Sequence, residues 1–414
     1  MIPEDWDFCC LDLIAKLSSG TTPSRSQEDR YYRNGKYHWV KTTDLNNSHI
    51  ITTEETVTQE ALDETCLQVY PPGTVFVAMY GGFNQIGRTG LLKISAAVNQ
   101  ALIAIQPKEN KLNSAYLLAN LNYRVEHWKS VASSSRKDPN ITSQDVKDFT
   151  LPLPDIEEQR AIATALSDVD ALIAALDKLI AKQRHLKTAT MQQLLTGKQR
   201  LPGFGEGKGY KQTEIGVIPE DWEVRELEEI TDVDPENLGS TTHPEYEFKY
   251  ISLEDVTCGV LNNYSEQIFS SSPSRARRVL QKGDVLLSTV RPNLKSHLIF
   301  QEEGTDWVCS TGFAVLRCKE GLSISEFLFP HLFSDNIDRQ IETLIAGSNY
   351  PAINSGDVKS LEIPVPPVEE QRAIATVLSD MDAAIAALEA RRAKTQAIKQ
   401  GMMQELLTGR TRLV

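Results

Sequence analysis

The stretch EEQRAIATALSDVDALIAAL, residues 157–176, decides the fold, because the chain repeats it almost unchanged as EEQRAIATVLSDMDAAIAAL at residues 369–388. At a constant offset of 212, residues 157–201 match residues 369–413 at 28 of 45 positions without a gap. Self-similarity at a fixed offset indicates one structural unit used twice. We therefore interpret the chain as a tandem duplication with nearly identical helical segments.

The similarity extends upstream of the repeated stretch. TSQDVKDFTLPLP, ending at Pro154, resembles NSGDVKSLEIPVP, ending at Pro366, and the opening IPEDW of residues 2–6 returns at residues 218–222. The regions between are only loosely alike and contain short β-rich runs such as TVFVAM, ALIAI, DVLLSTV and FAVLRC between polar loops. Each half is therefore predicted to hold a mixed α/β domain, with Trp6 and Trp222 as core anchors where the domain packs on the helices.

The repeated segments have the apolar pattern of a coiled coil. Their apolar positions step by three and four residues, as Ile162, Leu166, Val169, Ile173, Leu176 and Ile180 in the first copy and Ile374, Leu378, Met381, Ile385 and Leu388 in the second. Such steps form the a/d seam of paired helices. Prolines stop each helix from extending upstream, and Gly197 and Gly409 are placed to end it. A helix over residues 155–197 would be about 60 Å long, and two such helices most simply pair with each other.

These patterns predict an α+β fold with two mixed α/β domains separated by two long helices, which form an antiparallel coiled coil with pseudo-two-fold symmetry. If the halves are equivalent, the C-terminal end should lie near Met1. The predicted boundaries are the first domain at 1–154, the first helix at 155–197, a linker at 198–216, the second domain at 217–366 and the second helix at 367–414.

Composition narrows the class of protein. No apolar run approaches the ~20 residues needed to span a bilayer, and the start of the chain has no signal-peptide pattern. The six cysteines show no CxxC spacing. We therefore expect a reduced, cytoplasmic protein without a membrane segment.

The sequence contains none of the catalytic motifs that we sought. There is no HExxH, no Cys/His cluster at metal spacing, no GxSxG and no Asn-Pro-Pro-aromatic tetrad. Jointly, these absences favour a non-catalytic binding protein without a metal or cofactor of its own.

Charge is distributed unevenly along the chain, whose net charge is −13. Residues 1–154 hold 15 Lys and Arg against 17 Asp and Glu, whereas residues 217–366 hold 12 against 25. Proteins that coat nucleic acid nonspecifically are basic overall. If this chain binds DNA, local basic loops or another subunit must supply the positive charge.

The motifs LPLPDIEEQRAIA (151–163) and IPVPPVEEQRAIA (363–375) each lead into a helix that ends in QQLLTGK or QELLTGR. They closely resemble the specificity subunits of type I restriction-modification systems, as does the alternation of two variable and two repeated regions, and the resemblance covers essentially the whole chain. It implies that each variable region reads one half of a bipartite, asymmetric target in double-stranded DNA.

The resemblance also implies that the coiled coil sets the spacing of the two half-sites and docks two modification (methyltransferase) subunits. S-adenosylmethionine would bind to those partners. Restriction subunits would add translocation and cleavage with ATP and Mg²⁺. No catalytic residue and no cofactor would belong to this chain.

Candidate DNA contacts are polar and basic side chains in the loops, because base edges and phosphates are recognised by such groups. In the first half they form three clusters. The first is Thr22, Ser24, Arg25, Lys36 and Lys41, the second is Asn84, Gln85 and Arg88, and the third is Ser134, Arg136 and Lys137. The second half offers, as their counterparts, Arg275, Arg277, Arg278, Arg291, Asn293, Lys295, Ser348, Asn349 and Tyr350. Each residue taken alone is consistent with an ordinary surface side chain in contact with water, so the prediction rests on the clusters.

A third group is polar yet identical in both helices, namely Glu158, Gln159 and Arg160 with Glu370, Gln371 and Arg372. Two alternatives remain open for it: the residues contact the modification subunit, or they lock the helix start to its own domain. The main rival function for the whole chain is a coiled-coil scaffold that does not bind DNA. Such a scaffold would explain the acidic charge more easily, but neither the paired domains nor the resemblance.

Overall fold

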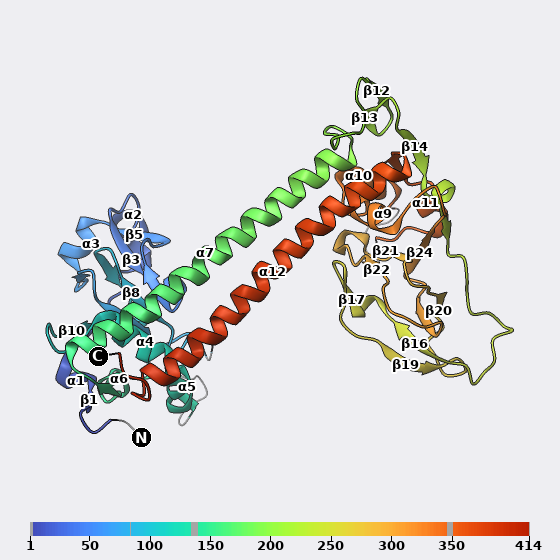
Figure 1. Cartoon of the computed structure of the whole chain (residues 1–414). Helices are drawn as coiled ribbons and strands as arrows, with labels where there is room; N and C mark the ends of the chain where they lie inside the picture. The colour runs from blue at the N-terminus through green and yellow to red at the C-terminus, as the bar shows by residue number, and fades with distance from the viewer. Residues whose placement is uncertain (1–2, 83, 134–139, 346–350, 414) are drawn as a thin grey trace. The chain divides into compact units, whose positions relative to one another are not determined.

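The structure, a computed structural model, describes residues 3–82, 84–133, 140–345 and 351–413. The chain divides into two compact units: unit 1 holds residues 1–178 and 389–414, and unit 2 holds residues 179–388. Unit 1 therefore combines both ends of the chain, whereas unit 2 is one continuous segment. Figure 1 labels many of the elements of both units.

Unit 1 contains three sheets. Strands β1 (Asp7–Cys10) and β11 (Thr150–Leu153) pair antiparallel. A five-stranded sheet has the order β2 (Ala15–Ser19), β10 (Leu102–Pro107), β7 (Val75–Ala78), β8 (Thr89–Leu92) and β4 (Ser48–Ile50). A four-stranded sheet has the order β5 (Glu55–Val57), β3 (Tyr37–Val40), β9 (Ala96–Val98) and β6 (Val69–Tyr70), in which β3 and β9 run parallel.

The short helices of unit 1 lie between these strands along the chain. They are α1 (Leu11–Ile14), η1 (Arg25–Gln27), α2 (Glu28–Tyr31), η2 (Thr42–Asp44), α3 (Gln59–Glu64), α4 (Ser114–Tyr123), α5 (Val125–Ser133) and α6 (Ser143–Lys147).

Unit 2 has a closely matching set of sheets. Strands β14 (Glu223–Glu226) and β25 (Glu362–Val365) pair antiparallel. One four-stranded sheet has the order β15 (Thr231–Val233), β24 (Phe313–Cys318), β21 (Val285–Ser288) and β22 (Leu298–Ile299). The other has the order β19 (Ser265–Ile268), β16 (Glu247–Ile251), β23 (Trp307–Ser310) and β20 (Ala276–Val279), in which β16 and β23 run parallel.

Two hairpins and six short helices complete the described part of unit 2. The hairpins are β12 (Tyr210–Thr213) with β13 (Gly216–Pro219), and β17 (Val256–Thr257) with β18 (Val260–Leu261). The helices are α8 (Leu227–Ile230), η3 (Leu253–Asp255), η4 (Pro292–Leu294), α9 (Ser325–His331), α10 (Asp335–Leu344) and α11 (Ser355–Lys359). The first hairpin lies partly in the segment that the sequence presented as a linker.

The two repeated segments form the long helices α7 (Ile156–Leu195) and α12 (Val368–Leu406). Within unit 1 they are joined by ion pairs from Asp177 to Arg392 and from Asp170 to Lys399. The number rises on one helix while it falls on the other, so the helices run antiparallel, as predicted. In unit 2, Lys187 and Asp382 pair at 2.5 Å.

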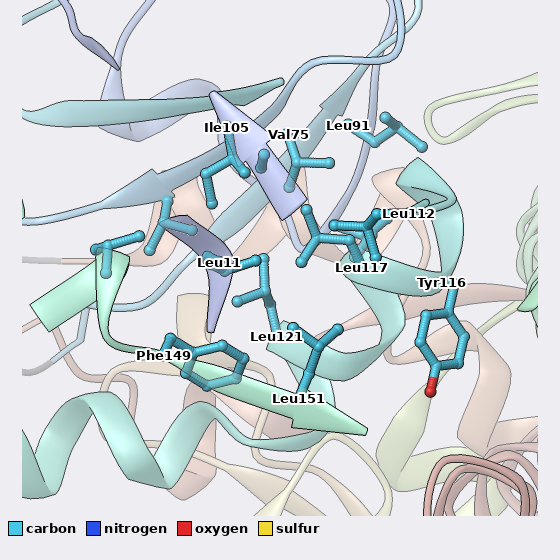
Figure 2. Packing of buried hydrophobic residues seen from close by; sticks show 14 of the residues in the cluster. Leu11, Val75, Leu91, Ile105, Leu112, Tyr116, Leu117, Leu121, Phe149 and Leu151 are labelled. Atoms are coloured by element: carbon cyan, nitrogen blue, oxygen red, sulfur yellow. The ribbon is translucent and has the colours of Figure 1, made fainter. Parts of the chain in front are cut away.

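Each unit buries its own core, to which both long helices contribute. In unit 1, Ile162 and Leu166 of α7 and Leu406 of α12 pack with the sheet and α4. Figure 2 shows this core, where the labelled side chains of Leu11, Ile105, Leu121 and Phe149 converge. In unit 2, Leu194, Leu195, Ile374 and Leu378 take the corresponding places. The predicted seam is confirmed, because all of its residues are buried or half-buried.

Trp6 and Trp222 are 7% and 0% exposed, as expected for core anchors. The predicted β-rich runs form β7, β10, β21 and β24.

Candidate nucleic-acid interface

In unit 1, the loop that holds one of the predicted clusters is bonded to the segment just ahead of α6 (Ser143–Lys147). The loop after β7, residues 79–88, holds Asn84, Gln85 and Arg88. The backbone N–H of Ile141, just ahead of α6, donates to the carbonyl oxygen of Met79 at 3.0 Å. This bond joins the loop to the segment that follows the third predicted cluster.

The loop after β7 presents polar side chains from a tight backbone. Asn84 is exposed, while Gln85 and Arg88 are half-buried, and Arg88 Nε donates to the carbonyl oxygen of Asn84 at 3.0 Å. Gly81 has a φ of 118°, and a Cβ there would lie 2.2 Å from Gln85 Oε1. Glycine is therefore required where the Gln85 side chain folds under the loop.

Unit 2 repeats this arrangement with different side chains. The loop after β21, residues 289–297, is held by bonds from Ile353 N–H to the Thr289 carbonyl at 3.0 Å and from Arg291 N–H to the Pro351 carbonyl at 2.8 Å. Arg291 and Asn293 are exposed. Equivalent loops with different polar residues therefore stand at the same place in the two units.

Six of the predicted contacts cannot be placed. They lie outside the described residues: Ser134, Arg136, Lys137, Ser348, Asn349 and Tyr350.

The first predicted cluster lies on the other sheet of unit 1 and is rich in ion pairs. Arg25 Nη2 lies 2.5 Å from Glu55, and its guanidinium stands 4.1 Å above the Tyr32 ring. Lys41 Nζ lies 2.7 Å from Glu55 and 3.2 Å from Glu54. The bond to Glu55 is the main cause that raises the pKa of Lys41. These two cations are thus partly neutralised by neighbouring acids.

The other three members of this cluster differ in exposure. Lys36 and Ser24 are exposed and Thr22 is half-buried, and Ser24 Oγ lies 2.8 Å from Ser26 Oγ.

The basic cluster of β20 differs from what the sequence predicted. Arg25 comes ahead of β3, whereas Arg275 comes ahead of β20, whose position in its sheet corresponds to β6 and not to β3. The two clusters are therefore not structural counterparts. Arg275 is exposed, and the guanidinium of Arg277 stands 4.9 Å above the Phe269 ring.

Arg278 is largely buried and is held by bonds within unit 2. Its side chain is 11% exposed and is paired with Asp234, and its Nη2 donates to Ser355 Oγ at 3.2 Å. Burial lowers the pKa of the guanidinium. These bonds tie β20 to the segment after β15 and to the first residue of α11.

Lys295 is intermediate in exposure between Arg275 and Arg278. It is half-buried, and its Nζ lies 2.6 Å from Asp338 of α10.

The polar residues shared by both helices form a lock inside each unit. In unit 2, Arg200 Nε and Nη2 donate to Glu370 at 2.6 and 2.7 Å, and its Nη1 and Nη2 donate to Asp221 at 2.9 and 3.1 Å. Trp222 Nε1 donates to Glu370 Oε2 at 3.0 Å. Burial opposes the charge on Arg200, but the bonds to Asp221 and Glu370 outweigh it and raise its pKa.

Unit 1 contains the same lock, built from the two ends of the chain. Arg412 Nε and Nη2 donate to Glu158 at 2.5 and 2.7 Å, and its Nη1 and Nη2 donate to Asp5 at 3.0 and 2.8 Å. Trp6 Nε1 donates to Glu158 Oε2 at 3.1 Å. The expected closeness of the C-terminal end to the start of the chain is thus borne out at Asp5, since Met1 lies outside the described residues.

The glutamines next to these glutamates complete the lock. Gln159 accepts from Asn113 N–H at 2.9 Å and donates to the carbonyls of Lys111 and Pro154 at 3.0 and 2.9 Å. Gln371 makes the equivalent three bonds in unit 2.

The glutamates and glutamines of both locks are at most 1% exposed. Their identity in the two copies therefore follows from the second alternative, a lock between the helix start and its own domain. Arg160 and Arg372 are exposed. Arg160 pairs with Glu157 at 2.6 Å on its own helix, and contact of either arginine with a partner stays a prediction.

Sequence reasoning missed the arginines of the locks. The signal was present, because Arg200 and Arg412 occupy equal positions within the repeat.

Neither a metal-binding cluster nor a membrane-spanning helix is found in the described part of the chain. No group of three or more His, Cys, Asp and Glu there could hold a metal ion. No helix there is long and apolar enough to cross a membrane.

Comparison with known proteins decides the family. The model of the type I restriction modification DNA specificity domain matches the chain twice, at residues 3–183 and 219–400. The chain belongs to this specificity-domain family. The two matches cover the two halves of the duplication, and the resemblance found in the repeated motifs is confirmed.

Two curated specificity subunits align over at least 90% of the chain. The type I restriction enzyme MjaVIII specificity subunit of Methanocaldococcus jannaschii is 25% identical over 425 residues, covering 100% of this chain and 94% of that protein. The EcoDI specificity subunit of Escherichia coli is 21% identical over 396 residues, covering 90% and 80%.

Solved structures support the fold. The S subunit of a type I restriction-modification system from M. genitalium has a TM-score of 0.57 at 16% identity, over 98% of this chain and 96% of that one. A chain from a study of complex assembly in a type I R-M system gives 0.59 at 18% identity, over 98% of both chains.

Proposed function

We propose that this specificity-family protein is the DNA-recognition subunit of a type I restriction-modification complex, in which each unit contacts one half of a bipartite, asymmetric target. One observation carries the proposal: the DNA specificity model matches twice, and the matched halves place equivalent loops with different polar side chains at the same end of equivalent sheets. Different side chains at equivalent positions recognise different bases, so the target is asymmetric.

The chemistry of the complex belongs to its partners in this proposal. Two modification subunits dock on α7 and α12, bind S-adenosylmethionine and methylate the target, while the helices set the spacing between half-sites. Restriction subunits add ATP- and Mg²⁺-dependent translocation and cleavage. The proposed location of the complex is the cytoplasm, where it meets the DNA.

The acidic second half is compatible with DNA binding if the partners share the contact with phosphates. Residues 217–366 hold 12 Lys and Arg against 25 Asp and Glu. A modification subunit on each side would supply the missing positive charge. Binding by the complex should then depend on salt more steeply than binding by the isolated chain, because each cation–phosphate contact releases a counterion.

The test is to co-express the chain with its modification partner and map DNA methylation across the genome of the host. The expected result is one split, asymmetric methylated motif. Asn293→Ala should relax or abolish one half of the motif and leave the other half unchanged, and Asn84→Ala should do the reverse. A full genome map without a split motif would refute the proposal and favour the rival scaffold function.

A further inference from the structure

The loop after β21, residues 289–297, carries an exposed apolar side chain at its tip. Leu294 is 58% exposed. Its neighbours on the loop are Asn293 and Arg291, both exposed and polar, with Lys295 on its other side. An apolar residue surrounded by groups that bind phosphates and bases is poorly suited to contact with water alone, and it is well suited to contact with stacked bases.

The backbone holds this tip in a defined conformation. Arg291 and Lys295 both adopt left-handed conformations, with φ of 51° and 52°, which L-residues other than glycine rarely take. The N–H groups of Leu294 and Lys295 donate to the carbonyls of Arg291 and Pro292, at 2.9 Å in both cases. Backbone strain of this kind persists only where the surroundings fix it.

Side-chain and hairpin contacts fix the base of the loop. Lys295 Nζ pairs with Asp338 of α10 at 2.6 Å, and the Ser288 N–H donates to Nδ1 of buried His297 at 3.1 Å. The hairpin β17–β18 lies against the loop, because Gly259 N–H donates to the His297 carbonyl at 2.8 Å and Cys258 Sγ lies 3.9 Å from the Leu294 carbonyl oxygen. A fixed Leu294 loses little conformational entropy on binding.

We infer that Leu294 is a wedge, a side chain that inserts between two neighbouring base pairs of the half-site contacted by unit 2 and partly unstacks them. The inference rests on the proposed function and adds to it a specificity-determining residue that reads how easily one base step opens. Flexible pyrimidine–purine steps open at lower cost than other steps. Unit 2 would therefore favour such a step even where no side chain reaches a base edge.

The chain offers a matched control and a built-in reporter. Leu322 is also in unit 2 and is 42% exposed, but it lies ahead of α9, outside the loop. Cys258 is an exposed free cysteine, and its contact with the Leu294 backbone places it beside the wedge. A base near the wedge that carries a mixed disulfide should therefore exchange with the Cys258 thiol, which forms the protein–DNA disulfide and releases the small thiol.

The experiment uses the full chain without its modification partner, so that no methyltransferase can flip a base. A duplex that the wild-type chain enriches from a random library serves as the probe, with 2-aminopurine placed at successive positions of the unit 2 half-site. Binding by the wild type should raise the fluorescence at one step. Leu294→Ala should weaken binding about tenfold and abolish that rise, whereas Leu294→Met and Leu322→Ala should preserve both.

Each other outcome is decisive. Equal binding by Leu294→Ala and Leu322→Ala overturns the wedge, and so does weaker binding by Leu294→Ala with the fluorescence rise intact. The wedge is also overturned if Cys258 forms the disulfide with bases far from the step whose fluorescence rises. Cys258→Ser is the negative control. If the chain alone enriches no duplex, the same assays are run on its complex with the modification subunits, and failure of that complex to enrich any duplex would refute the proposed function, and the wedge with it.

Discussion

The burial of the ion pair in the unit 2 lock allows us to predict how much unfolding free energy is lost when Arg200 is replaced. Arg200→Met removes the cation that faces Glu370, a carboxylate whose side chain is 1% exposed, while the Arg200 side chain itself is 12% exposed. A buried ion pair that loses one partner leaves an uncompensated charge, which typically costs 3–5 kcal/mol. Since Glu370 keeps the bond from Trp222, we expect the lower end, about 3 kcal/mol.

A surface pair in the same unit provides the matched control. Arg225 pairs with Glu223 at 2.5 Å, but its side chain is 36% exposed and that of Glu223 is 62% exposed. Exposed pairs contribute about 0–1 kcal/mol, so Arg225→Met should have a small effect. The double variant Arg200→Met/Glu370→Met removes the stranded charge and should be no less stable than Arg200→Met alone.

The assay must report on each unit separately, because Arg200 and Glu370 both lie in unit 2. Pulsed hydrogen exchange read by mass spectrometry across a urea series gives the unfolding free energy of peptides in unit 2 and in unit 1. Arg200→Met should shift the peptides of unit 2 and leave those of unit 1 in place. A shift below about 1 kcal/mol, the range of an exposed pair, would show that the lock is not an energetically coupled buried pair.

Three further predictions follow. Burial lowers the pKa of His331 to about 3, so the unfolded state takes up a proton below pH ~6.5 that the folded state does not. The stability of unit 2 should then fall as the pH drops from 6.5 toward 3, by about 1.4 kcal/mol per unit for this group. In acid urea titrations His331→Asn should remove this dependence and exposed His243→Asn should not; equal pH slopes would contradict the assignment. Gly197→Ala should destabilise more than Gly203→Ala in urea unfolding, since both have positive φ but only at Gly197 would a Cβ meet Pro219, at 2.5 Å; equal losses would exclude the clash. Asp221 has a pKa lowered from 3.8, mainly by its bond to Arg200, so Asp221→Asn should lower stability at neutral pH and have less effect as the pH falls through the lowered pKa; a loss independent of pH would be evidence against this pairing.

The long helices could be predicted from the sequence because their signal is local and repeated. The a/d steps from Ile162 onward and the glycines at both helix ends are read from neighbouring residues. Pro330 lies in the last turn of α9, where proline is unfavourable for continuing a helix, and α10 begins as a separate helix.

The lock could not be predicted because its members are distant in sequence. Arg412 and Asp5 are 407 residues apart, and nothing near Glu158 shows that its carboxylate is buried. Polar residues shared by two copies were equally consistent with a partner surface. Burial decides the question for the glutamates and glutamines, and it is a property of the assembled unit.

Among the candidate DNA contacts, local sequence likewise pointed to some residues and gave no information on the surroundings of others. Residue type alone pointed to Asn84, Arg291 and Asn293, which are exposed on equivalent loops and whose contact with DNA stays a prediction. It gave no sign that Arg278 pairs with Asp234, which lies 44 residues away. It also passed over Leu294, because an apolar residue in a loop has no distinctive local pattern.

The split composition of unit 1 has a consequence for how the protein is made. Unit 2 is one continuous segment, residues 179–388, whereas unit 1 also needs residues 389–414. Met403, Leu406 and Leu407 complete the unit 1 core, and Arg412 follows them. During synthesis the first domain to leave the ribosome is therefore the last to be finished, and it waits with an open apolar face while the second domain folds. A nonsense mutation a few codons from the end would damage the beginning of the protein.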